Sequence, residues 1–314
     1  MKGLQLAREY FDAHGAPMIE RKFASCRDRI AAGLVGDGSE CFGFDDEISR
    51  DHDWGPSFIL WLTREDYSAI GEALQAEYDR LPGEFAGMPA RTPSVWGMGR
   101  VGVFEIGAFY RQFTGLESIP QTLSQWRAIP EENLAVCTNG EVFTDPAGEF
   151  TRIREALLGG YPEDLRRKKL ASYLMSAAQS GQYNFLRSVR RGELVAAQYA
   201  ETRYIADVIS IAFLLNRRYR PFYKWMHRSL AHLPILGSRL HAMLSDLVTI
   251  HSRAQGATLY RMKALLIEEI ARTVIGGLRE QGLSDSESDF LLDHGPEVQK
   301  RIEDPGLRAQ SVWA

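Results

Sequence analysis

The chain has 314 residues, of which 45% are hydrophobic and 25% are charged, and its formal net charge is −4. This composition is typical of a soluble globular protein, and the length predicts two domains because single cores rarely grow beyond ~250–300 residues. The apolar runs are too short to cross a bilayer, so a membrane protein is not expected.

The first elements along the chain are expected to be a helix and a strand. Residues 4–33 have mainly helical character, with interruptions at His14-Gly15 and Pro17, and the apolar strand AAGLVG follows at 31–36. The strand runs into Gly38-Ser39. There the missing Cβ of glycine lets the backbone approach a phosphate, and the serine offers N–H and hydroxyl donors.

Two aspartates, Asp51 and Asp53, follow this turn and are separated by one residue. If residues 51–54 are extended, side chains at i and i+2 leave the same face of the strand, so both carboxylates converge. Two such oxygen ligands suit Mg²⁺, whose shell is completed by phosphates and water. An Asp-x-Asp pair alone is also common in turns and on solvated strand edges. The Gly-Ser turn upstream favours the metal site.

The combined pattern resembles the nucleotidyltransferase superfamily, the polymerase-β-like group that includes kanamycin and lincosamide nucleotidyltransferases. Its mark is Gly-Ser followed by Asp-x-Asp, with a glycine four residues after the serine and a serine just before the first aspartate. Gly43 and Ser49 take these two places. Arg50 makes the spacing one residue longer than in the antibiotic enzymes, so we expect a small bulge there.

The resemblance implies an activity and a set of site residues. It implies transfer of a nucleoside monophosphate, with AMP from ATP as the expected case, to a hydroxyl of an unidentified acceptor, with release of pyrophosphate. One or two Mg²⁺ ions would be held by Asp51 and Asp53, and the nucleotide would be bound in part by Gly38, Ser39 and Ser49.

The next elements are expected to alternate between strands and a helix. They are a strand at 57–62, a helix at 64–81 that ends before Pro82-Gly83, and a strand over 100–110. A further strand is expected within 132–150, with a hairpin turn at Asn139-Gly140. From Thr151 onward the pattern is helical, and the last helix is expected to begin with a capping box formed by Ser284 and Glu287.

The predicted fold class is therefore α+β, with a small mixed-sheet nucleotidyltransferase core at 1–155 followed by an all-α helical bundle at 156–314. The segments TNGEVFTDPAGEF, QYNFLRSVRRGE and LLNRRYRPFYKWMHR also resemble an uncharacterised family of bacterial domains that accompanies such cores. Neither internal repeats nor low-complexity segments are present.

A third carboxylate joins the metal pair in the superfamily, and Glu105 is the residue expected in this role. It lies on a strand among apolar positions, where an unpaired buried acid is costly unless a cation is beside it. The alternative is an acid at a strand end that faces water or pairs with an arginine. Glu141 and Asp145 are the other candidates for the third carboxylate.

The segment 214–228 interleaves cations with aromatic residues, which can bind phosphates and stack on a base. Pro221 breaks a helix, so the next one can present Tyr223 and Lys224 at its N-terminus, where anions are favoured. We expect Lys224, with Arg217 and Tyr223, to contact the nucleotide. The alternative is a solvated basic face whose aromatics pack between helices.

The expected partners follow from charge and cysteine content. Residues 1–160 carry 15 Lys+Arg and 25 Asp+Glu, whereas residues 161–314 carry 22 and 16, so the halves differ in sign. Nucleic acid is not an expected partner because the whole chain is acidic, with a pI of about 6.0. Three widely spaced cysteines and an N-terminus unlike a signal peptide predict a cytoplasmic location.

Two other functions fit the same residues. One is a non-catalytic nucleotide sensor whose bundle binds a partner. The other is an RNA-directed transferase, for which the basic face of the bundle would be the track. The sequence indicates neither the acceptor nor the base preference.

Overall fold

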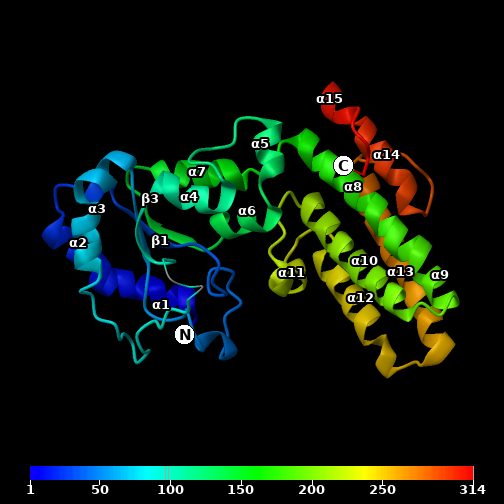
Figure 1. Cartoon of the computed structure of the whole chain (residues 1–314), viewed down its shortest axis with the longest axis horizontal. Helices are drawn as coiled ribbons and strands as arrows, with labels where there is room; N and C mark the ends of the chain where they lie inside the picture. Colours follow the sequence, from blue (N-terminus) through cyan, green and yellow to red (C-terminus); the bar gives the residue numbers. More distant parts are fainter. Residues whose placement is uncertain (96, 98, 314) are drawn as a thin grey trace. The chain divides into compact units, whose positions relative to one another are not determined.

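A computed structural model of the protein describes residues 1–95, 97 and 99–313 (Figure 1). The chain forms two compact units, Met1–Gly159 and Gly160–Ala314, and each is described by itself. The first unit combines helices with a mixed four-stranded sheet, and the second is helical. The predicted α+β fold class is confirmed.

The sheet of the first unit has the strand order β3-β2-β1-β4. Its strands are β1 (Ala31–Leu34), β2 (Ile59–Leu62), β3 (Gly102–Glu105) and β4 (Glu141–Thr144). β1 is antiparallel to both β2 and β4, while β2 and β3 are parallel. The end of β1 and the starts of β2 and β3 therefore lie at one edge of the sheet. Every residue of β1 and β2 is buried, which explains why both strands are continuous apolar runs.

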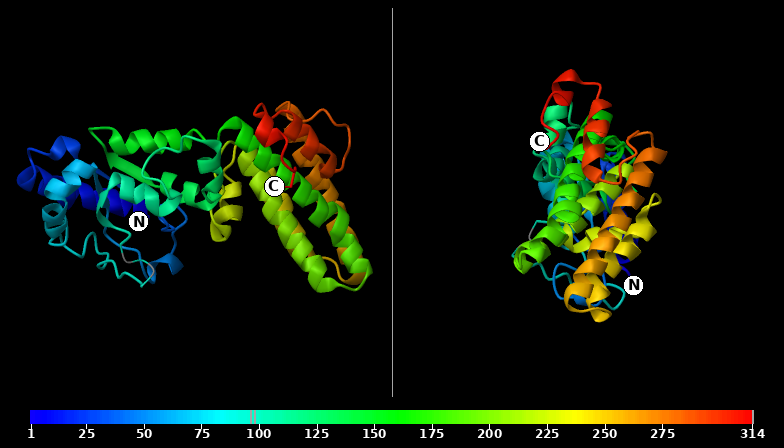
Figure 2. Two further views of the ribbon diagram at one scale, coloured as in Figure 1. Left: turned by 45° about the horizontal axis from the view of Figure 1, so that its top comes forward. Right: turned by 90° about the vertical axis from the view of Figure 1, so that its right-hand side faces the viewer.

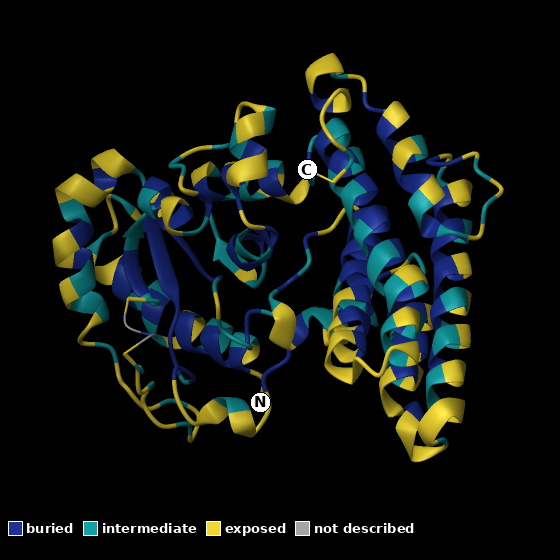
Figure 3. Ribbon diagram, turned by 45° about the vertical axis from the view of Figure 1, so that its right-hand side comes forward, coloured by how far each residue is buried: buried dark blue, intermediate teal, exposed yellow. Residues whose placement is uncertain are grey.

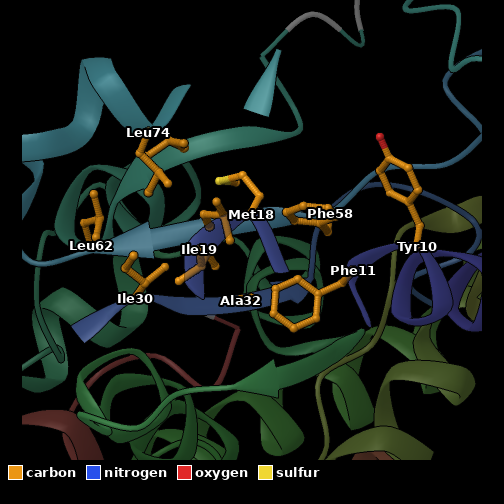
Figure 4. Close-up of a cluster of buried hydrophobic side chains, with 11 residues drawn as sticks. Tyr10, Phe11, Met18, Ile19, Ile30, Ala32, Phe58, Leu62 and Leu74 are labelled. Carbon is orange, nitrogen blue, oxygen red and sulfur yellow. The ribbon is translucent and has the colours of Figure 1, made fainter. Parts of the chain in front are cut away.

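Helices α1 (Gly3–Tyr10) and α2 (Ala16–Lys22) pack on the sheet. A π-helical turn at Phe11–Gly15 joins them, so the predicted interruption at His14-Gly15 is a change of helix type rather than a break. Figure 4 shows side chains from these helices in contact with side chains of β1 and β2. Helix α3 (Arg64–Tyr78) begins where the side chain of its N-cap, Thr63, accepts a hydrogen bond from the backbone of Asp66.

The predicted strand over 100–110 is wrong in its second half. β3 ends at Glu105, and helix α4 (Ile106–Thr114) follows directly. Ile106, Phe109 and Tyr110 are buried at helical spacing, so the apolar residues of this segment follow a period of 3.6. The helix ends at Gly115, which has a left-handed backbone.

The hairpin predicted at Asn139-Gly140 is also wrong. Residues before it form helix α6 (Glu131–Thr138), and only the residues after it form a strand, β4. The run 134–138 is wholly buried, and an apolar run without periodicity does not distinguish a buried helix from a buried strand. Helices α5 (Leu123–Ala128) and α7 (Glu149–Leu158) complete the unit.

Asn139 and Gly140 instead tie this connection to the end of β1. The Asn139 side chain accepts a hydrogen bond from the backbone N–H of Gly36 and donates one to its carbonyl, at 3.0 and 2.8 Å. A Cβ on Gly140 would lie 2.0 Å from the carbonyl oxygen of Leu34. Only glycine allows this approach between the two chain segments.

The second unit is helical, as predicted from Thr151 onward (Figure 2). Its helices are α8 (Glu163–Ala177), α9 (Leu186–Arg190), α10 (Leu194–Leu215), α11 (Tyr223–Leu230), α12 (Gly237–Thr249), α13 (Gly256–Glu280), α14 (Leu291–Lys300) and α15 (Pro305–Arg308), with a π-helical segment at Ala178–Phe185. Along α12 and α13 buried positions follow one side and exposed positions the other, whereas residues 207–215 of α10 are buried on every side (Figure 3). No helix among the described residues is long and apolar enough to cross a membrane.

The capping box predicted at Ser284 and Glu287 is wrong. Helix α14 begins only at Leu291, and its N-cap, Phe290, makes no side-chain cap. The Ser284 hydroxyl lies 2.7 Å from Nδ1 of the buried His294. The Ser284 side chain therefore forms a hydrogen bond with a buried imidazole and does not cap a helix.

Candidate functional site

A pocket lies at the end of β1, where the Gly-Ser turn begins. Its lining includes the turn residues 36–38 and 40–41, two arginines, Arg91 and Arg100, and the apolar side of α4. Phe109 and Phe113 of α4 line this last wall, together with Phe104 of β3. The position agrees with the sheet topology, because the end of β1 meets the starts of β2 and β3 at this edge.

The turn presents backbone donors. Across the described residues, no acceptor pairs with the backbone N–H of Asp37, Gly38 or Ser39. Successive N–H groups of this kind, with arginines nearby, form an anion-binding concavity. The predicted phosphate role of Gly38 and Ser39 is compatible with this geometry.

Gly38 leaves room for the side chain of its neighbour Glu40. The Glu40 carboxylate folds back over the turn, and a Cβ on Gly38 would lie 2.3 Å from its Oε1. Glu40 is buried, and Arg91 lies 3.7 Å from its carboxylate. Burial raises the pKa of Glu40, although the charge of Arg91 opposes this.

Asp53 is buried beside the same pocket and is held by hydrogen bonds to Ser94 and Thr92. Its carboxylate accepts hydrogen bonds from the backbone N–H and the hydroxyl of Ser94, at 2.8 and 2.5 Å. Its own N–H donates to the carbonyl of Thr92 at 2.9 Å. A Cβ on Gly97 would lie 1.7 Å from Oδ1 of Asp53, so this position needs glycine.

The environment of Asp53 favours its ionised form. Burial by itself raises the pKa of this carboxyl, but the two hydrogen bonds from Ser94 and the charges of Arg100 and Arg91 outweigh burial and lower it. Arg100 Nη1 lies 3.7 Å from Asp53 Oδ2, and Arg100 Nε lies 3.9 Å from Asp37 Oδ2. One guanidinium therefore stands between two carboxylates at the pocket.

The prediction that residues 51–54 are extended is wrong. Ile48–Arg50 form a 3₁₀ turn, Asp51 has helical angles, and Asp53 has a left-handed backbone with φ of 55°. Asp51 is exposed, and its carboxylate lies 2.8 Å from Nδ1 of His52. The two aspartates therefore occupy different surroundings. The bonds from Asp53 to Thr92 and Ser94 stabilise the turn, and aspartate tolerates this conformation better than most residues.

Two other predicted site residues of the first unit, Ser49 and Glu105, pair with partners other than Asp53. The Ser49 hydroxyl bonds to the carboxylate of Asp46, as part of a local turn. Glu105 is half-buried at the end of β3, and Arg64 Nε lies 3.2 Å from its carboxylate. Arg100 precedes β3, so Glu105 and the Asp53 environment mark opposite ends of that strand. The structure does not bring Glu105 and Asp53 together.

The remaining predicted residues belong to the second unit. Tyr223 and Lys224 begin α11, and both are exposed; the Lys224 ammonium lies 5.0 Å from the ring centre of Trp225. Arg217 has a left-handed backbone, and its guanidinium lies 2.7 Å from the carboxylate of Glu163.

Sequence reasoning missed the residues that hold Asp53. Ser94 and Gly97 lie in a loop whose only signal is its richness in glycine and proline, which indicates a turn but no partner. Arg100 lies two residues before β3, which starts at the same edge as β2, and that position was a usable signal.

The size of the pocket limits what it can enclose. Its cavity volume is about 40 Å³. One water needs at least ~10–15 Å³ on the same scale, so the cavity holds a few waters or one phosphate-sized group. A nucleotide bound there would keep its base and sugar outside the enclosed space.

Comparisons with known proteins give limited information. Residues 126–226 match the model of a family described as a domain of unknown function, DUF4037. No curated protein matches the chain. A solved nucleotidyltransferase-like protein from Exiguobacterium sibiricum is similar at 10% identity and a TM-score of 0.36, over 93% of this chain and 88% of that one. This likeness is too weak to assign a function here.

Proposed function

We propose that the first unit binds the phosphates of a nucleoside triphosphate in the pocket at the end of β1 and transfers the nucleoside monophosphate to an acceptor hydroxyl. The observation that carries this proposal is the meeting of three features at one sheet edge. They are a Gly-Ser turn with unpaired N–H groups, a pair of arginines, and the ionised, buried Asp53.

In the proposed reaction, a bond forms between the acceptor oxygen and the α-phosphorus, and the bond from that phosphorus to the β-phosphate breaks. Pyrophosphate leaves with the electron pair of that bond. Arg91, Arg100 and the turn N–H groups would offset the charge on the phosphates.

The carboxylates of the pocket suit different roles. A carboxyl group with a lowered pKa is a weak base, so Asp53 suits the binding of a cation rather than the acceptance of a proton. Glu40 lines the pocket, and burial raises its pKa. We therefore propose that Glu40 is the general base that accepts the proton of the acceptor hydroxyl.

Mg²⁺ fits the donors of this site. Among the described residues no group of three potential ligands is gathered. Mg²⁺, however, is commonly bound by one or two carboxylates with phosphate oxygens and water. Asp53 and Asp37, which share Arg100 as their present counter-charge, would be these carboxylates. When bound, Mg²⁺ would neutralise phosphate charge and lower the pKa of the acceptor hydroxyl.

A second candidate function is nucleotide binding without transfer. The specific observation in its favour is the divergence of Asp51, which is exposed and adjacent to His52, from Asp53, which is buried in the loop. A sensor needs the phosphate pocket but not a converging pair of carboxylates.

An experiment with two labelled forms of ATP separates these functions. The full chain is incubated with Mg²⁺ and a cell extract, once with ATP labelled at the α-phosphate and once with ATP labelled at the γ-phosphate. Transfer predicts that only the α-label reaches an acceptor while the γ-label appears in pyrophosphate. Saturable binding of both forms with no product would support the sensor, and absence of binding would reject both proposals.

A further inference from the structure

A second and larger pocket lies within the helical unit. It is formed by α10, the end of α12 and the first turns of α13, which run side by side (Figure 1). Its cavity volume is about 460 Å³. Small-molecule sites commonly occupy about 300–1,000 Å³, so this pocket is large enough for a whole ligand.

About half of the lining is apolar, and the rest is polar or charged. The apolar half includes Phe185, Leu194, Ala197, Ile205, Val248 and Leu259. The α10 residues among them lie on one face of the helix, because they are spaced by three or four residues and their multiples. Leu194 and Val248 remain 50% and 51% exposed, so apolar surface continues to the mouth of the pocket.

A buried ion pair belongs to the lining of the pocket. Lys263 Nζ donates to both carboxylate oxygens of Glu201, at 2.6 and 2.7 Å. Both residues line the pocket, and both are buried, at 8% and 3% exposure. A buried ion pair rarely stabilises a fold better than apolar residues of similar volume, so its place in the lining of this pocket suggests a role in binding a ligand.

The pair still has hydrogen-bonding capacity. An ammonium group has three N–H donors, and two of those on Lys263 are used by Glu201. Across the described residues, no other acceptor pairs with this ammonium group. Each carboxylate oxygen of Glu201 likewise retains a lone pair. A donor and an acceptor therefore stand side by side.

We propose that this pocket binds an uncharged, mainly apolar small molecule through one hydroxyl group. The hydroxyl accepts a hydrogen bond from Lys263 and donates one to Glu201, which satisfies both. The ion pair is already charge-balanced, so a charged ligand group beside it would add an unpaired buried charge. This site is independent of the phosphate pocket.

Three naphthalene probes of similar size test the proposal. The full chain is titrated with 2-naphthol, naphthalene and 2-naphthoate, and binding is followed by ligand fluorescence. We expect 2-naphthol to bind about tenfold more tightly than naphthalene, the effect of one hydrogen bond to a charged group. We expect 2-naphthoate to bind more weakly than naphthalene. Equal affinities for all three would overturn the hydroxyl recognition.

Two variants locate the binding. Thr202→Trp places a large side chain at the exposed side of the lining and is expected to reduce 2-naphthol affinity at least about tenfold. Tyr199→Trp is the matched control, because Tyr199 is 73% exposed on the same helix and lies outside the lining. If both variants bind 2-naphthol like the native chain, the site lies elsewhere and the proposal fails.

A double variant tests the ion pair without leaving a lone buried charge. Glu201→Leu with Lys263→Met keeps the approximate volume, so the fold is expected to survive. The tenfold preference for 2-naphthol over naphthalene should then disappear while naphthalene still binds. Retention of the preference would show that the ion pair does not bind the hydroxyl of the ligand.

A second copy of the chain is the alternative occupant of the apolar mouth. Light scattering across a concentration series tests it on the native chain and Thr202→Trp. The proposal predicts the same mass for both proteins. A native dimer that dissociates on Thr202→Trp would show that the pocket is an interface between copies and would overturn the small-molecule site.

Discussion

Ser94 holds the carboxylate of Asp53 with two hydrogen bonds, one from its backbone N–H at 2.8 Å and one from its hydroxyl at 2.5 Å. Thr92, Ser94 and Arg100 therefore fix the position and the ionisation of Asp53. Both properties can be measured without knowledge of any substrate.

Ser94→Ala removes the hydroxyl bond and leaves the backbone bond. We expect the free energy of unfolding at neutral pH to fall by about 1.5–3 kcal/mol, the range for a hydrogen bond to a charged group. Urea unfolding followed by circular dichroism measures this difference. Ser68→Ala, on the exposed face of α3, is the control and should change stability by less than about 0.5 kcal/mol.

The effect of Ser94→Ala should depend on pH. Because the pKa of Asp53 is lowered in the folded state, its contribution to stability is complete above its unfolded pKa of about 3.9 and is lost as pH falls through the folded value. The difference in unfolding free energy between the native chain and Ser94→Ala should therefore be constant from pH 5 to 7, because this range lies ~1 unit or more above the unfolded pKa. It should shrink below about pH 3.9. If the difference in unfolding free energy stays constant into this acid range, the effect of Ser94→Ala does not come from its hydrogen bond to Asp53.

Two glycines predict opposite effects of the same substitution. Gly97→Ala should destabilise the chain by about 1–3 kcal/mol, because its Cβ would lie 1.7 Å from Oδ1 of Asp53. Gly276→Ala lies within α13, where a Cβ meets nothing within 4 Å, and should stabilise it by about 0.5–1 kcal/mol. Thermal unfolding of both variants checks the signs, and stabilisation by Gly97→Ala would contradict the packing of Asp53.

Two carboxylates compete for the role of base. We expect Glu40→Gln to keep ATP binding but to lose turnover. The acidic limb of the pH–rate profile should disappear as well, because a base must be deprotonated to act. Glu105→Gln should keep turnover and lose at most about 1 kcal/mol of stability, since its partner is the exposed Arg64. The reverse result would restore the catalytic role predicted for Glu105 and remove Glu40 from it.

Lys224 remains a predicted phosphate contact. If it binds the nucleotide, Lys224→Ala should weaken ATP binding by about 1.5–3 kcal/mol and affect AMP less, because AMP lacks the β- and γ-phosphates. Calorimetry with both nucleotides measures this, with Arg261→Ala on α13 as an exposed cationic control. Equal losses for ATP and AMP would assign Lys224 to the solvated basic face.

The sequence allowed the fold class and most elements to be predicted, because the physics that decides them is local. Strand 59–62 and helix 64–78 carry clear apolar patterns, and Thr63 caps the helix through its own neighbour Asp66. The helix at 131–138 was predicted wrongly because the run 134–138 is wholly buried. This helix is chosen by packing, which a wholly apolar run does not encode.

The candidate site was only half predictable for a similar reason. Gly38 and Ser39 form a turn whose donors follow from local backbone chemistry. The surroundings of Asp53 depend on Ser94 and Gly97, some forty residues away, and its left-handed backbone exists because those contacts are made. No spacing rule within 51–54 contains that information.

Asp53→Asn is the most direct test of the proposed transfer, because it removes the negative charge and nearly preserves the shape. The measurement is Mg²⁺-dependent pyrophosphate release from ATP in the presence of a cell extract, for the native chain, Asp53→Asn and Glu47→Gln. Glu47 is an exposed acid of the same segment and serves as the control. We predict a loss of about a hundredfold or more for Asp53→Asn and native activity for Glu47→Gln. Native pyrophosphate release by Asp53→Asn would contradict the account.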